Sequence, residues 1–369
     1  MIPTVHEDET RCGRTARTPV RYTLTGTERG RALGSCAEVE GLFGEPHRGT
    51  YELFGWAPTA AVPRWVGMRV WLVPEDEALD PWLLEDVEAP RRSPGSDGLV
   101  LTGLDDYEGP PEGHRGAVRL HDGHRWLGSC REFTRVLPSE RAERPFVLRG
   151  LAPGEQLRAA LAKGTRRALD LEQADLEIRD DRGEPLTDHP LPARVSAWYP
   201  SSHGAGLIDL ELDDGAFTPL PSWTRPVLER WLAGPPDAPG SWVALDTRLR
   251  GAWLHLVQDR ACRRSHRPRP AGHAYRLDGR HITDEPGLYL ALGEAVNGPG
   301  GYFGGCLAAL DDCLRGRFGC TTPATLLWRD AAVARAHLSR RLSCDGRSHD
   351  LFAAVLGVLA EGGMHVTLA

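Results

Sequence analysis

An internal repeat constrains the fold of this chain more than any other feature of its sequence. The tetrapeptide Leu-Gly-Ser-Cys occurs at residues 33–36 and again at residues 127–130. The octapeptide YELFGWAP at residues 51–58 has a counterpart, FVLRGLAP, at residues 146–153, at almost the same distance downstream. Each copy has the pattern of short strands separated by a glycine-containing turn. We therefore predict a duplicated β-rich module in which the repeated motif serves packing.

The composition is that of a soluble globular protein, with 41% hydrophobic and 26% charged residues. The formal net charge of −7 argues against direct binding to nucleic acid. No segment approaches the roughly 18 uninterrupted apolar residues of a membrane span. Residues 1–21 are charged and lack the apolar core of a secretory signal. We expect a cytoplasmic protein that does not contact a membrane.

The eight cysteines of the chain are irregularly spaced and include no Cys-x-x-Cys pair. Such pairs are the usual signature of zinc sites and of dithiol redox chemistry. We therefore predict reduced thiols, no metal and no cofactor. Cys262 and His266 are close in sequence, but two neighbours make only half of a tetrahedral zinc shell.

Helix-like and strand-like patterns alternate after the repeat. Helices are predicted at Gly154–Leu169 and Arg225–Leu232 from the spacing of their apolar residues. Strands are predicted at residues 193–199, 206–212, 241–246 and 252–257. Residues 260–272 then contain five arginines and two prolines. We interpret this segment as a solvated linker, and a basic tract for RNA or phosphate is the alternative.

From residue 274 onward, short strands alternate with amphipathic helices. The pattern predicts a strand at 274–279, a helix capped by Thr283, a helix within 301–316, a strand at 321–330, a helix at 350–361 and a C-terminal strand. In the second helix, Leu307, Leu310 and Leu314 share one face, with Cys313 beside them. The order β-α-α-β-α-β implies a small, mostly parallel sheet covered by helices.

The second of these helices carries a recognisable motif, in which two aromatic residues and a glycine precede Leu-x-Ala-Leu-x-Asp-Cys-Leu-x-Gly. The motif occupies Tyr302, Phe303, Gly304, Leu307, Ala309, Leu310, Asp312, Cys313, Leu314 and Gly316. Supporting matches are LDG at 277–279, LLWR at 326–329 and EGG at 361–363. In these residues the C-terminal quarter of the chain resembles barstar, the inhibitor family of barnase-type guanyl-specific ribonucleases. The matches follow the family's order across the whole domain.

The resemblance implies that a helix of this domain enters the active site of a ribonuclease. Asp312 matches the acidic residue that takes the place of the substrate phosphate, where a carboxylate forms charge-assisted hydrogen bonds with arginines. Tyr302 matches an aromatic contact residue, and Phe303 and Gly304 match the contact loop. The resemblance thus implies a protein partner, a ribonuclease of the barnase or toxin type.

This chain departs from the family at several interface positions. Ala308 and Gly357 stand where the family has further carboxylates. Asp311 is an added acid, although its side chain points about 100° away from that of its neighbour Asp312. We expect weaker binding to barnase itself, or a different cognate nuclease. The candidate partner-binding residues are Tyr302, Phe303, Gly304, Ala308, Asp311 and Asp312.

Two other functions compete with ribonuclease inhibition. An enzyme could use Ser201, Ser202 and His203, but adjacent residues do not make a catalytic triad, and no nucleophile elbow, phosphate loop or zinc-protease motif is present. We therefore predict no enzyme. The second alternative is a scaffold protein whose barstar-like module no longer inhibits a nuclease, and the missing carboxylates favour it.

The predicted fold class is multidomain α+β. The expected order is a flexible tail at 1–17, the tandem β-rich repeat at 18–155 with copies at about 20–58 and 118–153, an α+β region at 156–259, an Arg/Pro linker at 260–272 and the barstar-like α/β domain at 273–369.

Overall fold

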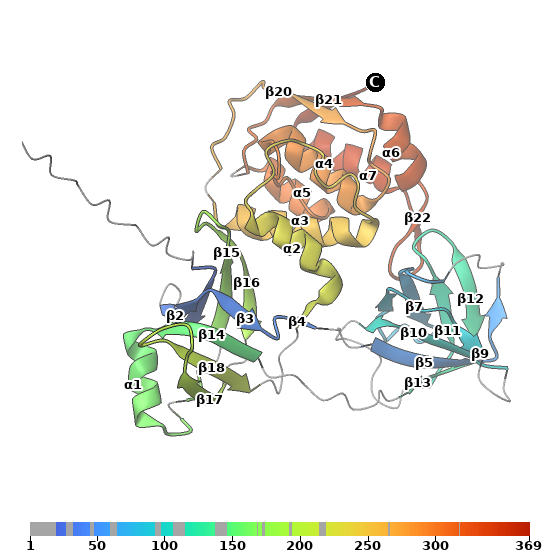
Figure 1. The fold of residues 1–369 in the computed structure, drawn as a ribbon. Coiled ribbons are helices and arrows are strands. Elements are labelled where there is room, and N and C mark those ends of the chain that lie inside the picture. The colour runs from blue at the N-terminus through green and yellow to red at the C-terminus, as the bar shows by residue number, and fades with distance from the viewer. Residues whose placement is uncertain are drawn as a thin grey trace, which may run out of the picture.

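The computed structural model describes most of the chain and shows a mixed α+β protein (Figure 1). The described residues are 20–26, 32–44, 48–59, 65–92, 97–105, 115–136, 146–167, 169–171, 174–191, 194–213, 219–264, 266–316 and 318–369. The tail predicted at 1–17 lies outside them. The strand-rich N-terminal region and the small parallel sheet near the C-terminus confirm the predicted fold class.

The strands form three main sheets. The first sheet has the order β16-β15-β1-β2-β14-β18-β17, with β3 paired to β14. Its strands are β1 Tyr22–Gly26, β2 Ala32–Cys36, β3 Glu38–Glu40, β14 Phe146–Pro153, β15 Ala174–Arg179, β16 Pro185–Leu191, β17 Arg194–Pro200 and β18 Ile208–Asp213. The second sheet consists of β5 Arg48–Phe54, β6 Ala57–Pro58, β7 Val70–Pro74, β8 Trp82–Glu85, β9 Arg91–Arg92, β10 Leu99–Asp105, β11 Val118–His121, β12 Trp126–Cys130 and β13 Glu132–Val136.

The third sheet is parallel, in the order β20-β21-β24. Its strands are β20 Ala274–Asp278, β21 Ala324–Arg329 and β24 Met364–Leu368. Two short pairs complete the strands: β4 Phe43–Gly44 with β19 Leu220–Pro221, and the hairpin β22 Arg341–Leu342 with β23 Ser348–His349. The helices are α1 Glu155–Lys163, α2 Arg225–Leu232, α3 Thr247–Cys262, α4 Glu285–Asn297, α5 Leu307–Leu314, α6 Ala331–Leu338 and α7 Leu351–Glu361, with a short 3₁₀ turn at Ser222–Thr224.

The two sequence copies exchange strands between the first two sheets. The end of the second copy pairs with the motif of the first, with Ala152 opposite Ser35 and Pro153 opposite Gly34. The end of the first copy makes the corresponding pairs in the second sheet, where β6 lies along Gly128 and Ser129 of β12. Each sheet therefore contains strands from both copies. The duplication itself stays a prediction from the sequence.

The motif glycines lie where these exchanged strands cross. A Cβ added at Gly34 would lie 3.0 Å from the carbonyl oxygen of Ala152. One added at Gly128 would lie 2.6 Å from the carbonyl oxygen of Ala57 and 2.5 Å from the Trp56 ring. The contact at Gly34 would be tighter than nine in ten real Cβ contacts, and those at Gly128 are shorter than real Cβ atoms essentially ever make. Close strand packing thus explains the glycine in each copy.

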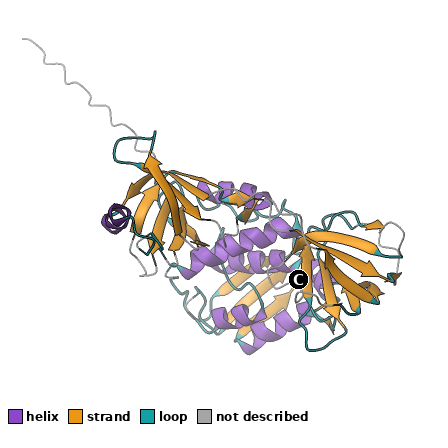
Figure 2. Ribbon diagram, turned by 90° about the horizontal axis from the view of Figure 1, so that it is seen from below, coloured by secondary structure: helices purple, strands orange, loops and turns teal. Residues whose placement is uncertain are grey.

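Helices α2 to α7 lie between two strand-rich units (Figure 2), whereas α1 lies on the outer side of the first sheet (Figure 1). One apolar core extends from the first sheet through α2 and α3 into the third sheet and its helices. The second sheet has a separate core, which includes Leu53, Leu101 and Phe133. Strand β15 pairs with β1 and β18 pairs with β14, across the predicted boundary at residue 155.

Helix α3 replaces the strand predicted at residues 252–257, which was wrong. Its buried side carries the charged Arg250 beside Trp253 and Val257, so apolar residues alone do not mark the stripe that identifies an amphipathic helix. The strand predicted at 241–246 was also wrong, because these residues form turns before the helix. Helix α4 is capped by Asp284, whose side chain accepts a hydrogen bond from Gly287 N, and not by Thr283.

A buried ion pair fixes α3 to α4. Arg250 Nη1 lies 2.9 Å from Asp284 Oδ2, and both side chains are less than a tenth exposed. The same arginine donates to Thr283 Oγ1 and to the carbonyl oxygen of Val243. Thr247 Oγ1 donates to Asp284 at 2.8 Å. Asp284 thus caps α4 and holds α3 with one carboxylate.

A second contact joins the hairpin β22–β23 to the second sheet, below α6 in Figure 1. Leu342 N donates to Gly123 O at 2.7 Å, and Gly346 packs against Trp126. The buried imidazole of His121 accepts from Gly123 N at Nδ1. Its Nε2, 3.1 Å from the carbonyl oxygen of Cys344, must therefore carry the proton and donate.

We expect Arg250→Met to lower the free energy of unfolding by about 3–5 kcal/mol, because it leaves the buried Asp284 charge without a partner. Urea unfolding measures this change. Arg250→Met with Asp284→Asn should lose less than Arg250→Met alone, since asparagine still caps the helix without a charge. Arg276→Met, at an exposed position of β20, is the control. An equal loss in the single and double variants would contradict the assigned role.

We expect the hairpin contact to weaken in acid. Burial lowers the pKa of His121 below 6.5, despite the nearby carboxylates of Asp122 and Asp345. The unfolded chain therefore binds the proton first, so stability is full above pH 6.5 and is lost as the pH falls below it. His121→Gln should reduce the fall in unfolding free energy between about pH 7.5 and about pH 5.5. His349→Gln, at an exposed position, should not, and equal slopes in all three proteins would sink the assignment.

Candidate functional site

Helix α5 is positioned by its buried face. Leu310, Cys313 and Leu314 are at most 3% exposed, which confirms them as core residues, and Leu307 is partly buried. Burial raises the pKa of the Cys313 thiol to about 12, so it stays protonated at neutral pH. The Sγ of Cys306 accepts a hydrogen bond from Ala309 N and caps the helix.

The opposite face of α5 presents one unpaired acid to solvent. Asp312 and Ala308 are exposed. The carboxylate of Asp312 makes no hydrogen bond or ion pair with any residue that the structure describes. Asp311 is partly buried and forms an ion pair with Arg315, one turn along the helix. The structure therefore distinguishes the two acids: Asp312 is free to meet a cation on another molecule, while Asp311 is already neutralised.

The loop that precedes α5 is held from inside the protein. Asn297 Nδ2 donates to the carbonyl oxygens of Tyr302 and Phe318, at 2.7 and 2.9 Å. Gly304 has φ of +95°, and a Cβ there would lie 2.9 Å from Leu310 Cα. Close approach of this loop to its own helix thus explains the glycine.

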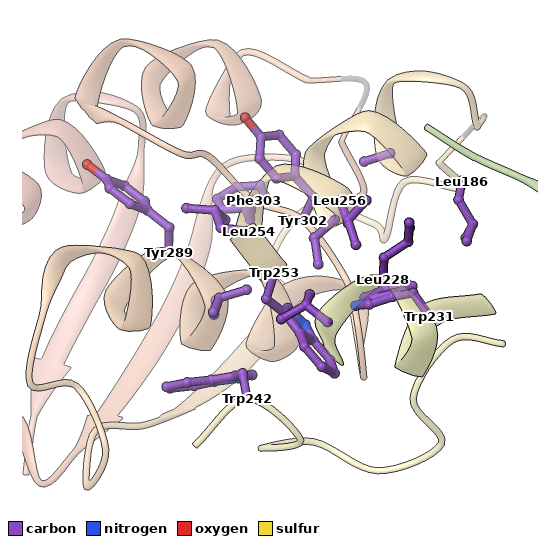
Figure 3. Close-up of a cluster of buried hydrophobic side chains, with 14 of the residues drawn as sticks. Leu186, Leu228, Trp231, Trp242, Trp253, Leu254, Leu256, Tyr289, Tyr302 and Phe303 are labelled. Atoms are coloured by element: carbon purple, nitrogen blue, oxygen red, sulfur yellow. The ribbon is translucent and has the colours of Figure 1, made fainter. Parts of the chain in front are cut away.

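Tyr302 and Phe303 are buried, with 4% and 0% of their surface exposed. They belong to an apolar cluster with Leu254 and Leu256 of α3 (Figure 3). The Tyr302 hydroxyl and the Gln258 side chain both lie beside Gly305. Burial raises the pKa of Tyr302 above its ordinary value of 10.0. Helix α3 therefore covers the side of the site that the aromatic residues were expected to offer to a partner.

The loop is covered further back as well. A Cβ added at Gly300 would lie 2.9 Å from both Pro236 and Trp231. Of the six candidate residues, the structure brings Ala308, Asp311 and Asp312 to the surface and buries Tyr302, Phe303 and Gly304. Their roles in binding stay predictions. Direct contact through Tyr302 would require α3 to move away.

There is free space around Gly357, the second position at which the resemblance implies a carboxylate. Gly357 lies on α7, which packs against α5, and a Cβ there would meet no atom within 4 Å. Longer side chains would therefore fit at this position. The alanine and glycine at 308 and 357 leave Asp312 as the one unpaired acid on the described part of α5.

In the loop that contains Ser201 and His203, the structure brings a third side chain, Glu38, close to the histidine. Ser201 Oγ lies 3.1 Å from His203 Nδ1, and His203 Nε2 lies 3.5 Å from Glu38 Oε2. The Ser201 hydroxyl also bonds to Asp209, whose pKa it helps to lower to about 2. Ser201 further accepts from His203 N, as in a local turn. Sequence reasoning missed Glu38 and Asp209 because they are distant in the chain.

Among the described residues, there is no group of three or more His, Cys, Asp or Glu side chains that could hold a metal ion. His266 Nε2 lies instead 3.1 Å from the carbonyl oxygen of Ala261. Within the same residues, no helix combines the length and apolarity needed to cross a membrane.

The unfolding free energies of two variants can distinguish the buried Tyr302 from the exposed Asp312. We expect Tyr302→Ala to cost about 3–5 kcal/mol of unfolding free energy, because it removes a core aromatic side chain. Asp312→Ala should change it by less than about 0.5 kcal/mol. Urea titration of the two variants tests this. A Tyr302→Ala variant as stable as the parent would mean that α3 does not cover the loop in solution.

The comparisons with known proteins identify a family for the C-terminal part of the chain. No curated protein and no solved structure matches the chain. Among protein families, the model of Barstar (barnase inhibitor) matches residues 272–345, which contain β20, α4, α5, β21 and α6. That family is one of inhibitors. The chain therefore carries a barstar-like domain at its C-terminal end, preceded by a region that no family matches.

Proposed function

We propose that this protein is an intracellular, immunity-type inhibitor of a guanyl-specific or toxin ribonuclease. The protein inhibits the enzyme by presenting the acidic face of α5 to the catalytic cleft. The observation that carries the proposal is the free carboxylate of Asp312, exposed on a helix whose other face is locked in the core.

The electrostatics of such a contact are favourable. Ribonuclease clefts must stabilise a phosphate in the transition state, so they hold cationic side chains. A carboxylate on a rigid helix meets these groups with little loss of conformational entropy. Because Asp312 has no intramolecular ion pair within the described residues, no existing pair must be broken when it binds.

The position of α3 limits how an enzyme could dock. With Tyr302 under α3, the contact surface is reduced to the outward side of α5 and its neighbour α7. Together with Ala308 and Gly357 in place of acids, this supports a cognate enzyme other than barnase. Catalysis by this chain itself is not part of the proposal.

A scaffold role for the barstar-like domain is the second candidate. The observation that favours it is the burial of the loop residues Tyr302 and Phe303, which would otherwise enlarge the contact. A scaffold would bind other proteins without lowering ribonuclease activity.

The test is RNA cleavage by barnase and by a panel of guanyl-specific and toxin ribonucleases, with the full chain added. The full chain is needed because a fragment without α3 would expose the apolar residues that this helix covers. We expect inhibition of at least one enzyme, and at least tenfold weaker inhibition by Asp312→Ala, since one charge-assisted hydrogen bond is worth about 1.5–3 kcal/mol.

Two matched variants serve as controls. Asp311→Ala removes an acid already paired with Arg315, and Asp278→Ala removes an exposed acid of β20. Both should inhibit nearly as well as the parent. Inhibition that is unchanged in Asp312→Ala would disprove the contact, and no inhibition across the panel would favour the scaffold.

A further inference from the structure

A cationic cavity lies beside the candidate site, at the junction of α3 and the barstar-like domain. Its volume is about 560 Å³. The walls are the C-terminal turns of α3, residues 266–270, and the loop from Val296 to Tyr302. This volume is within the usual range of roughly 300–1,000 Å³ for small-molecule sites.

The charge of the lining is one-sided. Arg260, Arg264, Arg267, Arg269 and His266 line the cavity, and none of its lining residues is acidic. Arg264 is paired with Glu184, at 3.0 Å. Arg267 and Arg269 form no ion pair with any described residue. Unpaired guanidinium groups that share a cavity repel one another unless an anion lies between them.

The backbone that carries Arg267 and Arg269 is held in place although it lies outside regular structure. Arg269 N donates to Gly319 O at 3.1 Å, and Gly272 N donates to Pro323 O at 2.6 Å. The His266 ring packs against Phe318, with ring centroids 5.4 Å apart. The segment that the sequence suggested as a solvated linker is therefore anchored to the barstar-like domain, and its arginines border a defined cavity.

The C-terminal ends of α3 and α4 account for only part of the positive charge that lines the cavity. Helices α3 and α4 both end near the cavity, and cations are favourable beside the carbonyl groups of a helix C-terminus. The effect is confined to the last turn. Arg260 belongs to the last turn of α3, whereas Arg267 and Arg269 lie beyond its end at Cys262.

We propose that this cavity binds a small phosphorylated ligand of about mononucleotide size. Guanidinium groups meet phosphate oxygens in bidentate pairs, which match both the charge and the geometry of the lining. The site is separate from the acidic face of α5, so it does not depend on ribonuclease inhibition. Because Tyr302 lines the cavity, a bound ligand contacts both α3 and the loop that α3 covers.

The experiment is isothermal titration of the full chain, at low salt, with pyrophosphate, ATP and adenosine. Pyrophosphate and ATP should bind, and adenosine should not, because only the first two carry phosphate. The double variant Arg267→Gln/Arg269→Gln should bind at least tenfold more weakly, since each lost charge-assisted contact is worth about tenfold. Both positions are exposed, so the variant should fold.

The matched control is Arg276→Gln, which removes an exposed arginine of the same domain outside the cavity. It should bind like the parent. Equal weakening in the control and the double variant would reduce the effect to overall charge and overturn the proposal. Absence of binding by both phosphate compounds would overturn it too, as would tight binding of a short oligoribonucleotide that ATP does not displace.

Discussion

The docking of α3 onto α4 is the contact on which the rest of the structure depends. The Arg250–Asp284 pair is buried, and further hydrogen bonds with Thr247, Thr283 and the carbonyl of Val243 reduce the cost of burying its charges. Around it, the apolar residues of α3 make one core with the first sheet and the third. The barstar-like domain is thereby joined to the preceding region by packing as well as by the chain.

The same helix decides what the site can offer. Residues that would enlarge a protein interface, Tyr302 above all, are used for internal packing, because α3 covers them. The acid on the far side of α5 is untouched by this packing. In the proposed function, a partner would meet a narrower and more electrostatic surface than the motif suggests, and such surfaces influence association rate and specificity more than affinity.

Strand exchange between the sheets has a comparable effect on the other half of the molecule. The end of each predicted copy pairs with a strand of the other copy, so each of the two sheets is built from both parts of the chain. The hairpin β22–β23 adds a contact from the barstar-like domain to the second sheet, through His121 and Gly123. The regions are thus linked at several points that are distant in sequence.

Local patterns in the sequence predicted three helices and three strands of the C-terminal domain, the core face of α5 and the family, because helical spacing and the motif around Asp312 are short-range signals. They did not predict α6 or the hairpin β22–β23. Helix α3 was misread, since the charged Arg250 lies on its buried side and the mostly apolar run at 252–257 suits a strand as well as a helix. Tertiary structure alone decided that Tyr302 is covered and that Arg260, Arg264, Arg267 and Arg269 border a cavity. Both features depend on contacts between segments far apart in the chain, which no local pattern records, whereas the pairing of Asp311 with Arg315 is local to α5.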